Sequence, residues 1–201
     1  MNDTLVILAG GMSSRMKNPP SSNSISREVE DQANDRSKSL ISVGNEGRPL
    51  MDYLLYNAKQ AGYKNIYMVI NEKGGLFKEF YGKKTANNIF NGLHISFAIQ
   101  YIPIDRVKPF GTADAVFQAV EQFKELQTQQ FTVCNSDNLY SEKALKALRE
   151  TKHANAFISY DRDGLAFSED KILKFAVVQL DRKNYLQNPQ AIPPPSSTHS
   201  K

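Results

Sequence analysis

Short runs of apolar residues recur along the chain and alternate with stretches whose apolar positions follow a helical period. The runs that predict buried strands are Leu5–Ala9, Asn65–Ile70, Ile95–Tyr101, Phe131–Cys134, Ala156–Tyr160 and Leu173–Leu180. Each is short, rich in apolar residues and bounded by polar or glycine positions, which is typical of strands covered on both faces.

Between these runs the spacing of apolar residues predicts helices. They cover Pro49–Ala61, Leu76–Tyr81, Thr112–Leu126 and Ser141–Arg149. Pro49 suits a first helical turn, Gly62 supplies a stop, and Thr112 is expected as an N-cap. Alternating strands and helices indicate an α/β fold, in which a Rossmann-like, mostly parallel sheet carries helices on both faces. Ligands bind beyond the carboxyl ends of the strands in such sheets.

Two polar stretches do not fit a core. Residues 17–37 have no hydrophobic period and are expected to form a long mobile loop within an α/β domain that spans residues 1–186. Residues 187–201 contain three consecutive prolines and several serines, and are expected to form a disordered tail.

Composition narrows the class of protein. Of the 201 residues 40% are hydrophobic, and 25 Lys and Arg against 21 Asp and Glu leave a net charge of +4. The basic residues are interspersed and form no stripe, so we expect no nucleic-acid partner. A single cysteine, Cys134, excludes an intramolecular disulfide. The apolar run after Asp3 is too short for a signal peptide or a membrane span, so we expect a cytoplasmic protein with no membrane association.

The turn after the first strand carries the first candidate chemistry. Gly10 and Gly11 lack a Cβ and let backbone N–H groups approach a phosphate, which the guanidinium of Arg15 can then grip. No Gly-Lys-Ser/Thr and no Gly-x-Gly-x-x-Gly is present, so neither a P-loop nor a dinucleotide fingerprint fits. From the glycines alone, a plain tight turn with a surface arginine remains open.

The whole turn, Leu8-Ala9-Gly10-Gly11-Met12-Ser13-Ser14-Arg15-Met16, resembles the signature loop of the nucleotidyltransferase superfamily that makes nucleoside-diphosphate sugars. Molybdopterin guanylyltransferases and the cytidylyltransferases of isoprenoid synthesis have similar loops. The sugar enzymes usually carry glycine where Ser13 stands. The resemblance implies a GT-A-like nucleotidyltransferase fold and covers about Thr4 to Leu180, with most of the acceptor half missing from the C-terminal part.

Further segments match this superfamily in the same order. Lys38, in the Lys-Ser-Leu-Ile-Ser-Val run, resembles a lysine that contacts phosphate, although Ser37 replaces the expected proline. Gln100 and the Gly111-Thr112 pair resemble the elements that read the nucleobase. An amide offers a donor and an acceptor to a base edge, which agrees with such a role. A strand-edge glutamine and a simple helix start are the structural alternatives.

The segment Asn135-Ser136-Asp137-Asn138 follows the fourth strand and resembles the turn whose aspartate holds Mg²⁺. Carboxylate oxygens, water and substrate phosphates are the ligands that Mg²⁺ prefers. Asp137 is therefore the expected metal ligand, with an Asx-turn at a strand end as the alternative.

The resemblance implies transfer of a nucleotidyl group from a nucleoside triphosphate to a sugar 1-phosphate, with release of pyrophosphate and with Mg²⁺ as cofactor. Arg15 and Lys38 are expected to be catalytic and Asp137 to bind metal. The expected nucleotide contacts are Leu8, Ala9, Gly10, Gly11, Met12, Ser13, Ser14, Gln100, Gly111 and Thr112. A truncated domain that binds nucleotide without turnover, for example as a regulatory module, and a molybdopterin- or cytidylyl-type transferase both remain open.

Overall fold

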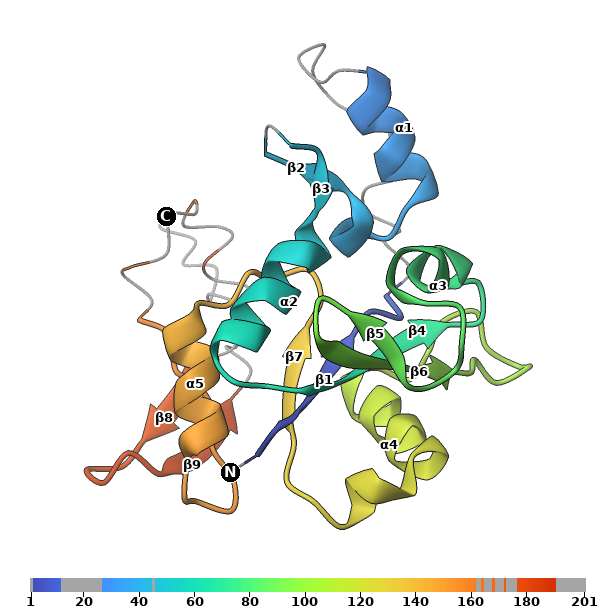
Figure 1. Ribbon diagram of the computed structural model, residues 1–201. Helices are drawn as coiled ribbons and strands as arrows, with labels where there is room; N and C mark the ends of the chain where they lie inside the picture. Colours follow the sequence, from blue (N-terminus) through green and yellow to red (C-terminus); the bar gives the residue numbers. More distant parts are fainter. Residues whose placement is uncertain are drawn as a thin grey trace, which may run out of the picture. The chain divides into compact units, whose positions relative to one another are not determined.

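The computed structural model describes residues 2–11, 27–44, 46–161, 164, 168, 172 and 177–190 (Figure 1). The chain divides into two compact units, Met1–Ala156 and Phe157–Lys201, and each is described by itself.

The first unit is built on a five-stranded sheet in the order β5-β6-β4-β1-β7. These strands are β1 (Thr4–Leu8), β4 (Asn65–Asn71), β5 (Asn88–Phe90), β6 (Leu93–Gln100) and β7 (Thr132–Asn135). Strands β6, β4, β1 and β7 run parallel, and β5 pairs antiparallel with β6. The mostly parallel sheet predicted from the sequence is confirmed. The chain moves outward from β1 to β4 and β6 and then returns to β7 on the other side of β1. That reversal places a topological switch point between β1 and β7.

Helices and two small elements complete this unit. They are α1 (Arg27–Asp35), the 3-10 turn η1 (Lys38–Leu40), the two-residue pair β2 (Ser42–Val43) and β3 (Arg48–Pro49), α2 (Leu50–Gln60), α3 (Gly75–Tyr81), α4 (Thr112–Gln122), η2 (Lys124–Gln127) and α5 (Glu142–Glu150). Helices α2, α3, α4 and α5 lie where the apolar spacing predicted them.

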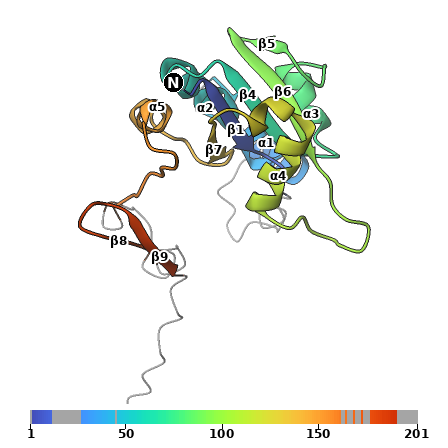
Figure 2. The same cartoon turned by 90° about the horizontal axis from the view of Figure 1, so that it is seen from below.

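Both faces of the sheet are buried. Leu5 and Ile7 of β1 pack into a cluster that includes residues of α2, α3 and α5, while Val6 between them packs with residues of α4 and η2. Figure 2 shows α4 and α2 on opposite sides of the strands. All three β1 side chains are fully buried, and each such side chain contributes about 1.5–3 kcal/mol to the free energy of unfolding. Strand alternation thus produces the two helical layers expected from the sequence.

Side chains of α4 complete the outer edge of β6 beyond the short strand β5. The backbone N–H of Ile99 donates to Gln122 Oε1 at 2.8 Å, and Gln122 Nε2 donates back to the Ile99 carbonyl at 2.7 Å. Gln118 makes the same two bonds with Tyr101, at 2.8 and 3.1 Å. Amide side chains therefore stand where a neighbouring strand would otherwise bond, and they fix α4 against the carboxyl end of β6.

The polar stretch 17–37 differs from its expected form over residues 27–35, which form the helix α1. Arg, Glu, Gln and Ala dominate this segment, and all have good helix propensity, so a helix forms without an apolar stripe. Gln32 attaches it to the rest of the unit, since its Oε1 accepts from the backbone N–H of Ser42 at 2.9 Å. The remainder of the expected loop before residue 27 lies outside the described residues.

The end of the chain also differs from the sequence-based prediction. Residues 156–160 form no strand, although a strand was predicted at Ala156–Tyr160. Their side chains are largely exposed, unlike those of the sheet strands in the first unit. The second unit contains a two-stranded antiparallel sheet of β8 (Val177–Leu180) and β9 (Leu186–Gln190). Residues 187–190, expected at the start of the tail, belong to β9, and residues 191–201 lie outside the described part.

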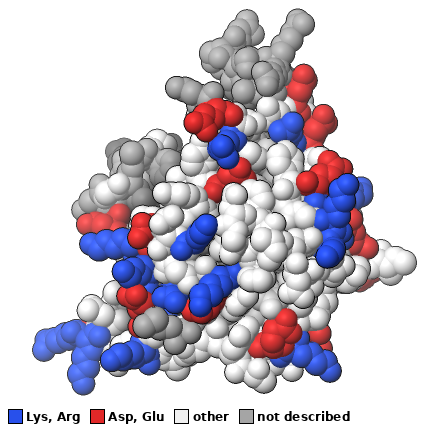
Figure 3. Space-filling model, viewed as in Figure 1, with Lys and Arg blue, Asp and Glu red and all other residues white. Residues whose placement is uncertain are grey.

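Two further observations concern the helices and the charged side chains. Among the described residues, no helix combines the length and the apolar character needed to cross a bilayer. Figure 3 shows basic and acidic side chains interspersed over one face of the molecule, as the mixed charge pattern of the sequence predicts.

Candidate functional site

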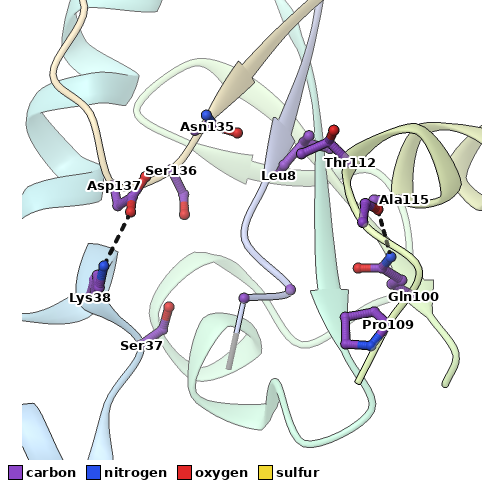
Figure 4. Close-up of a pocket in the computed structure, with 13 residues that line it drawn as sticks. Leu8, Ser37, Lys38, Gln100, Pro109, Thr112, Ala115, Asn135, Ser136 and Asp137 are labelled. Carbon is purple, nitrogen blue, oxygen red and sulfur yellow. Dashed lines mark hydrogen bonds and ion pairs between the residues drawn. The ribbon is translucent and has the colours of Figure 1, made fainter. Parts of the chain in front are cut away.

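A pocket of about 390 Å³ opens at the carboxyl edge of the first unit's sheet (Figure 4). Loops that follow β1, β6 and β7 form it together with η1 and the first turn of α4. The lining residues are Leu8, Gly10, Gly11, Ser37, Lys38, Gln100, Pro109, Gly111, Thr112, Ala115, Asn135, Ser136 and Asp137. This position, at the switch point between β1 and β7, is where open α/β sheets bind ligands.

The glycine turn after β1 forms one wall of the pocket. The Ala9 backbone N–H donates to the carbonyl of Val69 at 2.7 Å, so the chain still follows β4 as it leaves the strand. A Cβ on Gly10 would lie 3.0 Å from Gln100 Oε1, closer than nearly all real Cβ contacts. A Cβ on Gly11 would meet no described atom within 4 Å. Gly10 therefore packs closely against Gln100, whereas no described atom crowds Gly11.

Lys38 and Asp137 meet across the pocket. The Lys38 Nζ lies 3.5 Å from Asp137 Oδ2, and both side chains are about one-third to one-half exposed, at 34% and 44%. The backbone N–H of Ser136 donates to the Leu8 carbonyl at 3.1 Å, which holds the turn after β7 against the end of β1. Because an ion pair of this exposure contributes little to stability, both charged groups can exchange their partner for a ligand.

Gln100 is the last residue of β6, and its side chain is only 4% exposed. Its Nε2 donates to the Gly111 carbonyl at 3.1 Å and to Asp114 Oδ2 at 2.8 Å. Gly111 has φ +122°, a conformation that favours glycine, and it is the N-cap of α4. The expectation that Thr112 is the N-cap is wrong, because Thr112 is already the first helical residue.

The pocket gathers most of the residues that the sequence singled out. Leu8, Gly10, Gly11, Lys38, Gln100, Gly111, Thr112 and Asp137 line it, and Ala9 is buried beside it. The predicted contacts Met12, Ser13 and Ser14 and the predicted catalytic Arg15 lie outside the described residues. What each of these residues does remains a prediction.

Sequence reasoning missed Asp114, which does not line the pocket but holds Gln100. A signal was present, because Asp114, Gln118 and Gln122 are spaced by four residues and so share one face of α4. The sequence named Ser136 only as part of the turn after the fourth strand, although its backbone positions the Asp137 turn.

The described side chains can hold a divalent cation only in an open manner. No group of three or more His, Cys, Asp or Glu side chains gathers anywhere in the described part of the chain. Asp137 offers one half-exposed carboxylate to the pocket. Mg²⁺ is commonly held by one or two carboxylates together with water and substrate phosphates, so a single carboxylate beside a ligand-sized pocket fits that ion.

Cys134 lies one residue from the pocket but does not present a nucleophile. Burial raises the pKa of its thiol to about 12, so the reactive thiolate is scarcely populated at neutral pH. Cys134 instead packs in the core on the α2 side of the sheet.

Comparison with known proteins gives a family match over most of the chain. Residues 4–182 match the model of a family described as nucleotidyl transferase. A search of curated proteins finds no match.

Solved structures give matches to the fold. A crystal structure of UDP-glucose pyrophosphorylase complexed with UDP-glucose aligns with a TM-score of 0.51 at 14% identity, covering 74% of this chain and 52% of that one. A UDP-glucose pyrophosphorylase from Acinetobacter baumanii aligns with a TM-score of 0.45 at 19% identity, covering 68% and 46%. The chain spans about half the length of these structures. The first alignment agrees with the α/β fold predicted from the sequence.

Proposed function

Since this chain belongs to the nucleotidyl transferase family, we propose that it transfers a nucleotidyl group from a nucleoside triphosphate to a sugar 1-phosphate. The observation that carries the proposal is the pocket itself. It brings a glycine turn, a lysine, an aspartate and a buried glutamine together at the carboxyl edge of a parallel sheet.

In the proposed reaction, a phosphate oxygen of the sugar 1-phosphate attacks the α-phosphorus of the triphosphate. The new P–O bond joins the nucleoside monophosphate to the sugar phosphate, and the bond to the β-phosphate breaks to release pyrophosphate. Such transfers require little covalent help, so positioning and charge neutralisation by the protein dominate the rate.

The phosphate end of the nucleotide would lie at Gly11 and Lys38. No described atom lies within 4 Å of the position that a Cβ on Gly11 would take, which leaves room for a phosphate to approach the backbone. The Lys38 ammonium, in weak contact with Asp137, can turn to the negative charge that develops on the α-phosphate. Arg15 is proposed to stabilise the leaving pyrophosphate, on its resemblance to the family signature alone.

Asp137 is proposed to hold Mg²⁺, with the remaining ligands coming from substrate phosphates and water. When bound, Mg²⁺ would neutralise phosphate charge and polarise phosphoryl oxygens. The nucleobase would lie at the other end of the pocket, near Gln100 and Gly111. The first aligned structure is a complex with UDP-glucose, which supports a nucleotide-sugar product for this pocket.

A second candidate function is nucleotide binding without turnover, which we keep because the chain spans 52% of the first aligned structure. Both functions need the nucleotide end of the pocket. Only transfer requires a place for the sugar phosphate.

The test is release of pyrophosphate. The chain is incubated with Mg²⁺, each nucleoside triphosphate and a panel of sugar 1-phosphates. We expect release that depends on both substrates and on Mg²⁺. Lys38→Met should lower the rate by about 10²- to 10³-fold, as removal of other preorganised charge stabilisers does. Asp137→Asn should abolish the Mg²⁺-dependent release of pyrophosphate.

Lys59→Met is the matched control, because Lys59 is exposed, lies outside the pocket and donates to the Asn91 carbonyl. Its rate should equal that of the wild-type chain. Nucleotide-dependent thermal stabilisation without any pyrophosphate would favour the binding function. An undiminished rate in Lys38→Met would remove the lysine from the mechanism.

A further inference from the structure

We propose that Tyr140 is a positioning residue whose hydroxyl closes the turn that carries Asp137, and that it thereby sets how much Mg²⁺ strengthens nucleotide binding in the pocket. Tyr140 does not line the pocket itself. The inference rests on the proposed function, since it concerns the carboxylate that is proposed to hold the metal ion.

The Asp137 carboxylate has little support from other side chains. Among the described residues, the one side chain that contacts it is Lys38, whose Nζ lies 3.5 Å from Asp137 Oδ2. Both side chains are partly exposed, so this contact holds neither of them strongly. Under the proposed function, a bound nucleotide draws Lys38 to its phosphates. The position of the carboxylate then depends on the backbone of its own turn.

One side of this turn is attached to the sheet. The backbone N–H of Ser136 donates to the Leu8 carbonyl at 3.1 Å, and Ser136 is buried. Figure 4 shows Asn135, Ser136 and Asp137 in succession between the end of β1 and Lys38. This bond fixes where the turn begins, and the direction in which it continues depends on a second contact.

The hydroxyl of Tyr140 supplies that contact and joins both ends of the turn. The backbone N–H of Asn135 donates to Tyr140 Oη at 3.3 Å, and Asn138 Nδ2 donates to the same oxygen at 3.2 Å. A hydroxyl oxygen has two acceptor positions, and these two bonds use both. The two donors stand before and after the Ser136-Asp137 pair, so one oxygen closes the turn around the carboxylate.

Tyr140 is in turn fixed by the fold. Its ring is half-buried and packs against the core cluster on the α2 side of the sheet. Its carbonyl accepts from Asn57 Nδ2 of α2 at 2.8 Å. The next residue, Ser141, caps α5, because its side chain accepts from the backbone N–H of Ala144 at 3.2 Å. A well-anchored tyrosine therefore holds the turn, and outer partners of this kind orient metal ligands and raise affinity for the ion.

Nucleotide binding with and without the metal tests this inference. Dissociation constants of the full chain are measured for UTP, CTP, GTP, ATP and dTTP, once with Mg²⁺ and once with EDTA. For the nucleotide that binds best, the ratio of the two constants gives the gain in affinity due to Mg²⁺. We expect Tyr140→Phe to reduce this gain about tenfold. Binding in EDTA should change by less than about twofold, because the ring and the pocket stay in place.

Tyr67→Phe is the matched control. Tyr67 is a buried tyrosine whose hydroxyl donates to Glu125 Oε1 at 2.8 Å, and it packs on the α4 side of the sheet. Neither residue lines the pocket. Like Tyr140→Phe, this variant loses a hydroxyl hydrogen bond and some stability. Its gain in affinity from Mg²⁺ should nevertheless equal that of the wild-type chain.

Asn138→Ala removes one of the two bonds and leaves Tyr140 in place. Its gain in affinity from Mg²⁺ should fall about threefold. In a chain that already carries Tyr140→Phe, the same substitution should have no further effect, because the acceptor oxygen is gone. Asn138 is exposed, so this variant tests the inference even if Tyr140→Phe does not fold.

Each result decides something. An unchanged gain from Mg²⁺ in Tyr140→Phe or in Asn138→Ala would overturn the inference and leave the proposed function standing. An equal loss in Tyr67→Phe would also overturn it, because the effect would then follow from lowered stability. A wild-type chain that binds nucleotide equally well in Mg²⁺ and in EDTA would overturn the metal role of Asp137 and this inference with it. Failure of every nucleotide to bind would overturn the proposed function and this inference together.

Discussion

Gly10 and Gly11 follow each other in the chain, yet the described residues crowd only the first of them. A Cβ on Gly10 would lie 3.0 Å from Gln100 Oε1, so the Gln100 side chain would have to move. Gly11 borders no described atom on that side, so only a ligand would require its lack of a side chain. The sequence pattern Gly-Gly treats both positions as one motif, whereas the contacts separate packing from binding.

Alanine at each position should therefore give different results. Gly10→Ala forces Gln100 to move and should lower the free energy of unfolding by about 1–3 kcal/mol. Gly11→Ala should change it by less than about 0.5 kcal/mol. Urea unfolding measures both values. Under the proposed function, Gly11→Ala should still weaken nucleotide binding more than about tenfold, since its Cβ would point into the pocket.

Normal nucleotide affinity in Gly11→Ala would show that the open space beside Gly11 is not used by phosphate. Equal stability of the two variants would contradict the packing role of Gly10.

At the scale of elements, Asp3 ties the start of β1 to the end of α5. Its Oδ1 accepts from Arg149 Nη2 at 2.8 Å, and Lys64 lies 3.3 Å from its other oxygen. Burial alone would raise the pKa of Asp3, but the bonds from Arg149 and Lys64 outweigh it and lower the pKa below its ordinary value of 3.8.

A carboxyl whose pKa is lowered by folding stabilises the fold above its unfolded pKa, and this stabilisation is lost as the pH falls through the folded pKa. Asp3→Asn should lower the free energy of unfolding at neutral pH by about 1 kcal/mol. Because the wild-type chain loses the same contribution in acid, the difference should narrow between about pH 5 and about pH 2. Urea unfolding across this range measures it, and a difference independent of pH would contradict the ionic role of Asp3.

The elements whose sequence has an apolar pattern were predicted. The elements without such a pattern, α1 and β5, were not. Strands β1, β4, β6 and β7 are short runs rich in apolar residues, and helices α2 to α5 each bury one apolar face, so the sequence pattern predicts both. Helix α1 has two apolar residues in its sequence, Val29 and Ala33, and β5 is three residues long and pairs with β6. The run Ala156–Tyr160 has the composition of a strand but forms none, because composition alone does not determine strand pairing.

For the site, the signature residues were found by resemblance, and the residues that position them were not. The resemblance identified Gln100 and the Gly111-Thr112 pair as candidate nucleobase contacts. It assigned no role to Asp114, which lies two residues after Thr112. Its contact with Gln100 joins two elements, and neither sequence segment contains that information alone. Helix spacing could have suggested Asp114, but only the structure brings it to the amide.

At the scale of the molecule, every described residue that lines the pocket belongs to the first unit. The lining positions run from Leu8 to Asp137, and the unit spans Met1–Ala156. Its sheet and both helical layers are complete without residues of the second unit. Nucleotide binding should therefore not depend on the residues after Ala156.

A chain of residues 1–156 should fold and should be stabilised by the same nucleotide as the full chain. At a nucleotide concentration of about one hundred times the dissociation constant, the added stability is about 2.7 kcal/mol. A thermal shift with and without Mg²⁺ measures it in both chains. A shorter chain that folds but shows no shift, beside a full chain that does, would place part of the nucleotide site in the second unit.

The amides of Gln118 and Gln122 have a consequence for how copies of the chain meet. They occupy the backbone groups of Ile99 and Tyr101 at the outer edge of β6, where an extended segment from another molecule could otherwise add to the sheet. The helix thus protects the chain from self-association by strand addition there. Loss of both amides would leave unpaired backbone groups at this edge. We expect solubility at high concentration to fall at a smaller loss of stability than unfolding requires.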